Sequence, residues 1–141
     1  MQTISDLTTL LASMEPVLTD GEYLFCTVSV DKRSKLTVSP VLEFQEPEGI
    51  ALVLLKDDAE RLNISGQFAS RMIRLNVYSS LDAVGFLAAI TAQLAANGIS
   101  VQPVSAFYHD HLFVPEKRAN ESMKILNDLV RQARDNPTKA T

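Results

Sequence analysis

Residues 71–99 read RMIRLNVYSSLDAVGFLAAITAQLAANGI, and this stretch decides the fold. Residues 71–78 alternate between polar and apolar side chains, which is typical of a β-strand. Between residues 83 and 94 the apolar residues recur at helical spacing, and Asn97-Gly98 supplies a helix stop. The stretch therefore predicts a strand that leads directly into an amphipathic helix.

The residues that follow extend this unit toward the C-terminus. Residues 99–107 form a strand-like run that contains Pro103, which is typical of an edge strand or a bulge. A second short run, 111–114, leads to Pro115, where a helix can begin. The second half thus reads β-α-β-β-α, most of the βαββαβ unit of the ferredoxin-like fold.

The first half reads as a degenerate copy of the same unit with an inserted strand. The patterns predict a first helix that runs from the Thr3/Asp6 cap to Met14. It is followed by a strand at 22–29, a charged loop at 31–35, two strands at 41–45 and 50–55, and a second helix at 56–62. This half lacks an opening strand, and the second half lacks a closing one. Either the strand at 71–78 is shared between the halves, or a second chain fills the gap.

Composition excludes several classes of function. The 141 residues carry a net charge of −4 and no Lys/Arg cluster denser than residues 31–35, so neither nucleic acid nor an anionic membrane is expected as a partner. The single cysteine, Cys26, lies in an apolar run and allows no internal disulfide. The N-terminus lacks the features of a signal peptide, and the longest aliphatic run is too short to span a bilayer. We therefore expect a cytoplasmic protein.

No catalytic motif is present. The sequence contains no G-x-S-x-G, P-loop, H-E-x-x-H or G-x-G-x-x-G pattern, so we expect no catalytic residues and no cofactor. The two histidines, His109 and His111, flank Asp110. On a continuous strand they would share a face with Asp110 opposite, but two imidazoles are too few ligands for a stable metal site. A hairpin turn with locally bonded polar groups is the simpler interpretation.

Three stretches of the sequence resemble the ACT domain superfamily. The segment from Leu81 to Val101 resembles the opening of an ACT domain, in which Gly85 matches the motif glycine and Val84 replaces the proline, as in the aspartokinase-like branch. Residues 22–28 and 108–115 are similar to signatures of a group of small stand-alone bacterial proteins with two ACT-like repeats. The resemblance implies a tandem ferredoxin-like α+β fold, with an antiparallel sheet and helices on one face. It also implies binding of an amino acid or similar metabolite where two ACT units meet.

The loop before the predicted helix is the candidate site. A helix N-terminus attracts carboxylates, serine hydroxyls donate hydrogen bonds, and an aspartate can pair with an ammonium group, which together suit an α-amino acid. Tyr108 and His109 are placed at the rim of this site, across a repeat or subunit interface. The full set of expected ligand-binding residues is Ser79, Ser80, Asp82, Val84, Gly85, Tyr108 and His109. The competing interpretation is that Ser79 and Asp82 only cap the helix and that Gly85 only permits close packing.

These observations predict two ACT-like repeats, residues 1–66 and 67–134, followed by a flexible tail at 135–141. Unpaired sheet edges favour a homodimer. The expected function is that of a non-catalytic regulator that binds a small molecule, and the expected ligand is an amino acid. The alternatives are a structural or protein-interaction module without ligand, and a metal-dependent enzyme centred on His109 and His111.

Overall fold

The computed structural model describes residues 6–135. Its helices and strands, in chain order, are α1 (Leu7–Ser13), β1 (Glu15–Leu18), β2 (Tyr23–Val28), α2 (Val30–Lys35), β3 (Leu42–Glu46), β4 (Gly49–Leu55), α3 (Lys56–Arg61), β5 (Gln67–Asn76), α4 (Phe86–Ala96), β6 (Gln102–Ser105), β7 (Asp110–Pro115), a short 3-10 turn (Glu116–Arg118) and α5 (Ala119–Asp135). All strand pairs are antiparallel, in the order β3-β4-β2-β5-β7-β6, with β1 also beside β5.

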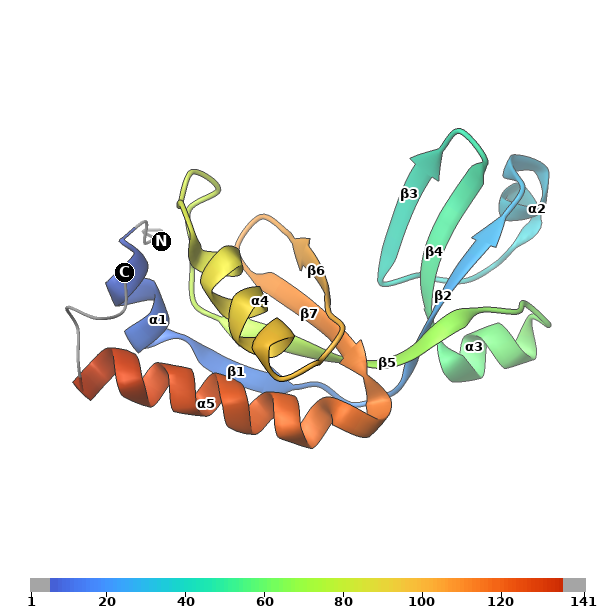
Figure 1. Cartoon of the computed structure of the whole chain (residues 1–141). Coiled ribbons are helices and arrows are strands. Elements are labelled where there is room, and N and C mark those ends of the chain that lie inside the picture. Colours follow the sequence, from blue (N-terminus) through green and yellow to red (C-terminus); the bar gives the residue numbers. More distant parts are fainter. Residues whose placement is uncertain (1–5, 136–141) are drawn as a thin grey trace.

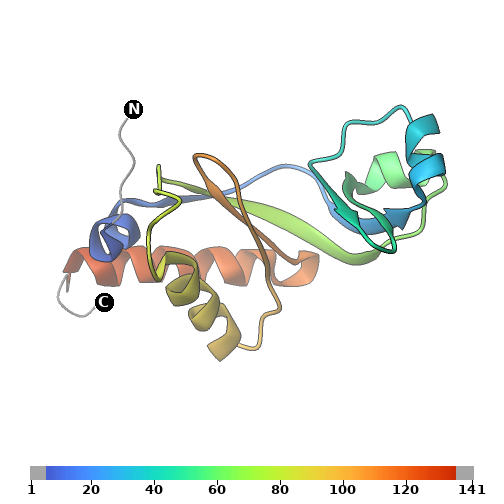
Figure 2. The same ribbon diagram turned by 90° about the horizontal axis from the view of Figure 1, so that it is seen from above.

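Strand β5 belongs to both halves of the molecule. Near its start Ser70 lies opposite Tyr23 of β2, and further along Ile73 lies opposite Leu18 of β1. Strand β7 pairs with the other edge of β5. Figures 1 and 2 show β5 running from one repeat into the other. The interpretation of a shared strand is therefore confirmed, and no second chain is needed to fill the gap.

Each repeat now has a complete βαββαβ set of elements. The first repeat runs β2-α2-β3-β4-α3-β5, and the second runs β5-α4-β6-β7-α5 and is closed by β1 from the N-terminal end of the chain. The expected tandem ferredoxin-like α+β fold is thus present. The division at residues 66 and 67 stays a prediction, while α1 and β1 contribute their apolar residues to the core of the second repeat.

Two predictions for the first half are wrong. The charged residues 31–35 lie in helix α2, because the Ser29 side chain accepts a hydrogen bond from Lys32 N–H and Lys35 pairs with Asp31 one turn away. The first repeat does have an opening strand, which is β2. What the sequence patterns missed is β1, a four-residue strand whose Pro16 lies on a sheet edge opposite Leu75.

Several element boundaries also differ from the expected ones. The strand expected at 99–107 is confined to β6, where Pro103 lies at the sheet edge as expected. Asp6 caps α1 by accepting a hydrogen bond from Thr9 N–H, whereas Thr3 lies outside the described residues. The last helix ends at Asp135, and residues 136–141 of the expected tail lie outside the described part of the chain.

Helices cover one face of the sheet. In the second repeat, α1, α4 and α5 bury a core in which Ile73, Ile90 and Leu126 have no exposed surface. A smaller core lies under α3 in the first repeat. On the opposite face the rings of Tyr23 and Phe113 meet edge to face at 5.5 Å, which joins the two repeats.

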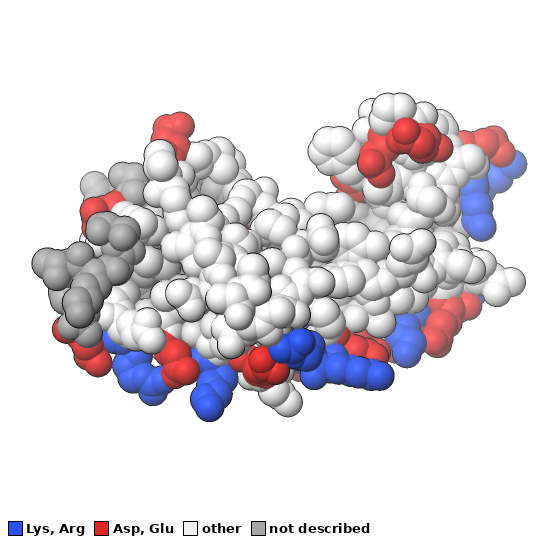
Figure 3. All heavy atoms as spheres, in the orientation of Figure 1, with Lys and Arg blue, Asp and Glu red and all other residues white. Residues whose placement is uncertain are grey.

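Charged side chains are unevenly distributed over the surface. In Figure 3 they gather along the edge formed by α5 and on the outer parts of the first repeat. The surface over α4 and β6, and the hollow between the two repeats, are largely uncharged in this view. Helix α4 itself contains no acidic or basic residue.

Candidate ligand-binding site

A nine-residue connection, 77–85, joins β5 to α4. In the first repeat the equivalent connection is one residue, Ser29, between β2 and α2. The long connection ends at Gly85, whose φ of 89° lies in the left-handed region that favours glycine. A Cβ added at Gly85 would meet only Leu7 Cδ2, at 3.7 Å. The glycine is therefore needed for its backbone conformation, and the expectation that it merely permits close packing is wrong.

The capping interpretation of Ser79 and Asp82 is also wrong. Helix α4 begins at Phe86, beyond the reach of an S-x-x-D cap at 79–82, and its N-terminus receives no hydrogen bond from a capping side chain. Ser79 instead donates a hydrogen bond to Asp110 Oδ2, with an O–O distance of 3.0 Å. Ser80 Oγ accepts a hydrogen bond from Asp82 N–H within the loop. The first N–H groups of α4 are therefore left available to a ligand.

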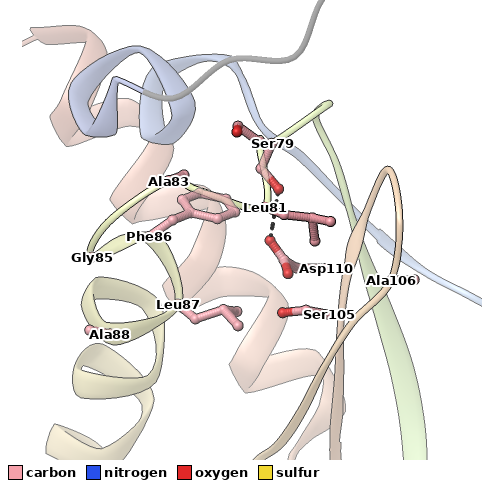
Figure 4. Close-up of a pocket in the computed structure, with 11 residues that line it drawn as sticks. Ser79, Leu81, Ala83, Gly85, Phe86, Leu87, Ala88, Ser105, Ala106 and Asp110 are labelled. Carbon is pink, nitrogen blue, oxygen red and sulfur yellow. Dashed lines mark hydrogen bonds between the residues drawn. The ribbon is translucent and has the colours of Figure 1, made fainter.

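A cavity of about 180 Å³ lies beside Gly85. Its walls come from the 79–85 loop, the first turn of α4 and the hairpin that joins β6 to β7. Four polar side chains line it, and the remaining lining residues are apolar or glycine; the four are Ser79, Ser80, Ser105 and Asp110. Figure 4 shows the Asp110 side chain pointing from β7 toward the start of α4, between Ser79 and Ser105. Larger hollows elsewhere on the described surface are more open to solvent.

Asp110 is the residue that sequence reasoning missed. The residue as a whole is only 6% exposed, and its carboxylate forms no ion pair within residues 6–135. The signal was the strand alternation, which places Asp110 on the face opposite His109 and His111. That is the helix-covered face, where a cavity beside α4 would lie.

The seven predicted ligand residues fall into two groups in the structure. Ser79, Ser80 and Gly85 line the cavity, whereas Asp82 and Val84 are exposed residues of the loop outside it. Tyr108 and His109 also lie outside, in a cluster of rings in which His109 stacks on Tyr78 at 5.2 Å and Tyr108 meets Tyr78 at 5.7 Å. The ligand-binding roles of all seven stay predictions.

The two histidines lie near backbone carbonyls. His109 Nδ1 lies 3.4 Å from the Val77 carbonyl oxygen, and His111 Nδ1 lies 3.4 Å from that of Val104. Partial burial lowers the pKa of His111, with smaller contributions from its neighbours. Among the residues that the structure describes, no three His, Cys, Asp or Glu side chains come together in a group that could hold a metal ion. Nor does any described helix have the length and apolar character needed to cross a membrane.

Comparison with known proteins identifies the family. Two family models described as ACT domain match the chain, one over residues 2–71 and the other over residues 67–128. VC0802 from Vibrio cholerae, described as a protein of unknown function and possible transport protein, has a crystal structure that superposes with a TM-score of 0.79. The two sequences are 37% identical, over 88% of this chain and 95% of that one. The chain belongs to the ACT domain family.

Less similar solved structures share the fold. Atu0741 from Agrobacterium tumefaciens superposes with a TM-score of 0.65 at 17% identity, covering 83% of this chain and 89% of that one. The ligand-free regulatory subunit of aspartate kinase from Thermus thermophilus gives a TM-score of 0.61 at 10% identity, covering 84% and 97%. The two repeats are therefore arranged like those of an aspartate kinase regulatory subunit. A comparison with functionally curated proteins finds no match.

Proposed function

We propose that this ACT protein is a non-catalytic regulator that binds a small α-amino acid in the cavity beside Gly85. The observation that carries the proposal is that cavity, which brings an uncapped helix N-terminus together with serine hydroxyls in a partly enclosed space of mixed polar and apolar lining. An amino acid fits this arrangement because its carboxylate is attracted by the free N–H groups and the helix dipole. ACT domains as a superfamily bind amino acids or similar metabolites, which agrees with this chemistry.

The regulatory role rests on a change of assembly state. Strands β3 and β6 are the end strands of the sheet within the described chain, and the uncharged surface over α4 and β6 adjoins the cavity. We propose that the protein forms a homodimer and that the ligand stabilises one arrangement of it, since a ligand shifts an equilibrium toward the state it binds more tightly. We propose that Tyr108 and His109, in the segment between β6 and β7 that borders the cavity, belong to this interface.

A second candidate function has an observation of its own. Leu81, Val84 and Phe107 are large apolar residues that are at least 70% exposed, and they lie close to the candidate site in the sequence. An exposed apolar patch marks a protein interaction site. The alternative is therefore an interaction module that binds a partner protein without any small ligand.

A thermal-shift screen separates the two functions. The purified chain is heated with each of the common amino acids, with several nucleotides, and with divalent metals in a separate series. A ligand at about 100 times its dissociation constant adds about 2.7 kcal/mol to the free energy of unfolding, which raises the melting temperature by several degrees. We expect a shift with one or a few amino acids. No shift with any amino acid would contradict the regulator and favour the interaction module, and a shift with metals alone would favour the histidine site.

A further inference from the structure

We infer that Asp110 is the group that recognises the ligand's ammonium, and that the cavity selects small, uncharged α-amino acids. This inference rests on the proposed function and adds to it the anchoring residue and the class of side chain. It begins from the buried carboxylate of Asp110, which lines the cavity but whose only hydrogen bond within the described chain is the one from Ser79 to Oδ2. The second oxygen, Oδ1, accepts no hydrogen bond from the described side chains and keeps some surface accessible to solvent.

A carboxylate with little exposed surface gains stability when a cation lies beside it. Asp110 is 94% buried, yet none of the ion pairs of the described residues includes it. The neighbouring His109 and His111 do not bond to the Asp110 carboxylate, because their Nδ1 atoms lie beside the backbone carbonyls of Val77 and Val104. Loss of hydration is compensated when a buried charge gains an opposite charge and hydrogen bonds. A ligand ammonium that donates to Oδ1 supplies both.

The N-terminus of α4 lies across the cavity from Asp110. In Figure 4 the first turn of α4, with Phe86 and Leu87, faces the hairpin that carries Asp110. The N-terminal end of an 11-residue helix without a capping side chain provides N–H donors and a partial positive charge. One wall is therefore suited to an ammonium group and the other to a carboxylate, which matches the two charges of an α-amino acid.

Size and charge limit the side chain of the ligand. The cavity holds about 180 Å³, close to the roughly 150 Å³ of an engineered cavity that accommodates benzene. Apart from Asp110, no acidic or basic side chain lines it, so a lysine or glutamate side chain would find no partner of opposite charge. Leu81 and Leu87 contribute apolar wall. Glycine, alanine, serine and threonine have the size and charge that this space accepts.

Isothermal titration of the wild-type chain tests the ligand class first. The series compares small uncharged amino acids with lysine, arginine, aspartate, glutamate, phenylalanine and tryptophan. The best amino acid is then compared with its analogue that lacks the amino group and with the amine that lacks the carboxylate. We expect the small uncharged class to bind, and both analogues to bind at least tenfold more weakly. Tightest binding of a charged or aromatic amino acid, or equal binding of the analogue without the amino group, would overturn the inference.

Asp110→Asn then tests the residue. The amide keeps the shape of the side chain but removes its charge, so we expect about 10- to 100-fold weaker amino-acid binding, the loss that follows from removing a charge-assisted hydrogen bond. Asp57→Asn, an exposed carboxylate on α3, is the matched control and should bind as the wild type does. Loss of binding in Asp82→Asn with retention in Asp110→Asn would assign the ammonium to Asp82 and overturn the inference, while the proposed function would stand.

These experiments also distinguish a failure of the Asp110 inference from a failure of the proposed function. If Asp110→Asn does not fold, as judged by circular dichroism, the analogue without the amino group still decides the question on the unaltered protein. Binding of amino acids with the wrong selectivity contradicts the inference alone. Absence of binding by every amino acid contradicts the proposed function, and the inference falls with it.

Discussion

Ser79 and Asp110 are 31 residues apart in sequence, and the hydroxyl of one donates a 3.0 Å hydrogen bond to the carboxylate of the other. Both side chains are buried, at 8% and 6% exposed. This bond ties the loop that follows β5 to the first residue of β7, and it forms part of the wall of the candidate cavity.

Replacing Ser79 with alanine should therefore destabilise the protein. Among residues 6–135, the change removes the one hydrogen bond that the Asp110 carboxylate accepts, which costs about 1–3 kcal/mol of unfolding free energy. Urea denaturation followed by circular dichroism measures the loss. Ser65→Ala, at an exposed serine, is the control and should stay within about 0.5 kcal/mol of the wild type. Equal stability of the two variants would show that the Ser79–Asp110 bond contributes little.

Truncation of Leu10 should weaken the second repeat rather than the first. Leu10 lies in α1, before the first strand of the first repeat, but is fully buried in the core formed by α1, α4 and α5. Leu10→Ala should cost about 2–5 kcal/mol, and hydrogen exchange should show lower protection in α4 and α5 than in β3 and β4. Leu81→Ala, at a residue 70% exposed, is the control. Uniform loss of protection over the whole chain would contradict a separate second core.

Substitutions of Gly85 should rank by their tolerance of the left-handed conformation. The φ of 89° disfavours alanine by about 1–2 kcal/mol, whereas asparagine visits this region more readily. There is room for a side chain, because the nearest atom to an added Cβ is 3.7 Å away. Gly85→Asn should therefore be more stable than Gly85→Ala in thermal denaturation. The reverse order would indicate that space, and not φ, is limiting.

Stability should fall below about pH 6.5 because of His111. Partial burial is the largest cause that lowers its pKa from the ordinary 6.5; the charges of His109 and Arg74 act in the same direction, and the Val104 carbonyl and Asp110 act against it. As the pH falls, the unfolded chain takes up the proton before the folded protein does. The stability contributed by neutral His111 is present above pH 6.5 and is lost as the pH falls through the lower folded pKa. Urea midpoints between pH 5 and 8 measure this slope, and His111→Gln should reduce it; an unchanged slope in that variant would assign the effect to other groups.

Ligand binding should change tyrosine fluorescence. The chain has three tyrosines and no tryptophan, and Tyr78 precedes Ser79 while stacking on His109, the neighbour of Asp110. A ligand that contacts Ser79 and Asp110 should shift this ring pair and alter the emission. Tyr78→Phe should abolish most of the change, whereas Tyr23→Phe, at the buried ring that begins β2, should keep it. A full response in Tyr78→Phe would place the reporter elsewhere.

Local patterns predicted most of the elements, but several starts and ends were wrong. The alternation in 71–78 and the helical stripe after Ala83 correspond to β5 and α4, because both elements bury one face. The S-x-x-D pattern at Ser79 and Asp82 suggested a cap, yet the helix starts at Phe86 and Ser79 bonds to Asp110 instead. The Ser79 hydroxyl bonds to a carboxylate 31 residues away and not to a nearby backbone group, and no local pattern predicts such a partner.

The tandem ACT fold can be predicted from the sequence, because hydrophobic period, turn residues and the Gly85 motif all depend on neighbours in the chain. That β1 closes the second repeat and that Asp110 faces the cavity become visible in the folded molecule alone. Both depend on pairing between residues far apart in sequence: Pro16 meets Leu75 across the sheet, and Asp110 meets Ser79 across the loop. Such pairings are selected by the burial of the whole core, so they follow from the packing of all the elements together and not from any one stretch of residues.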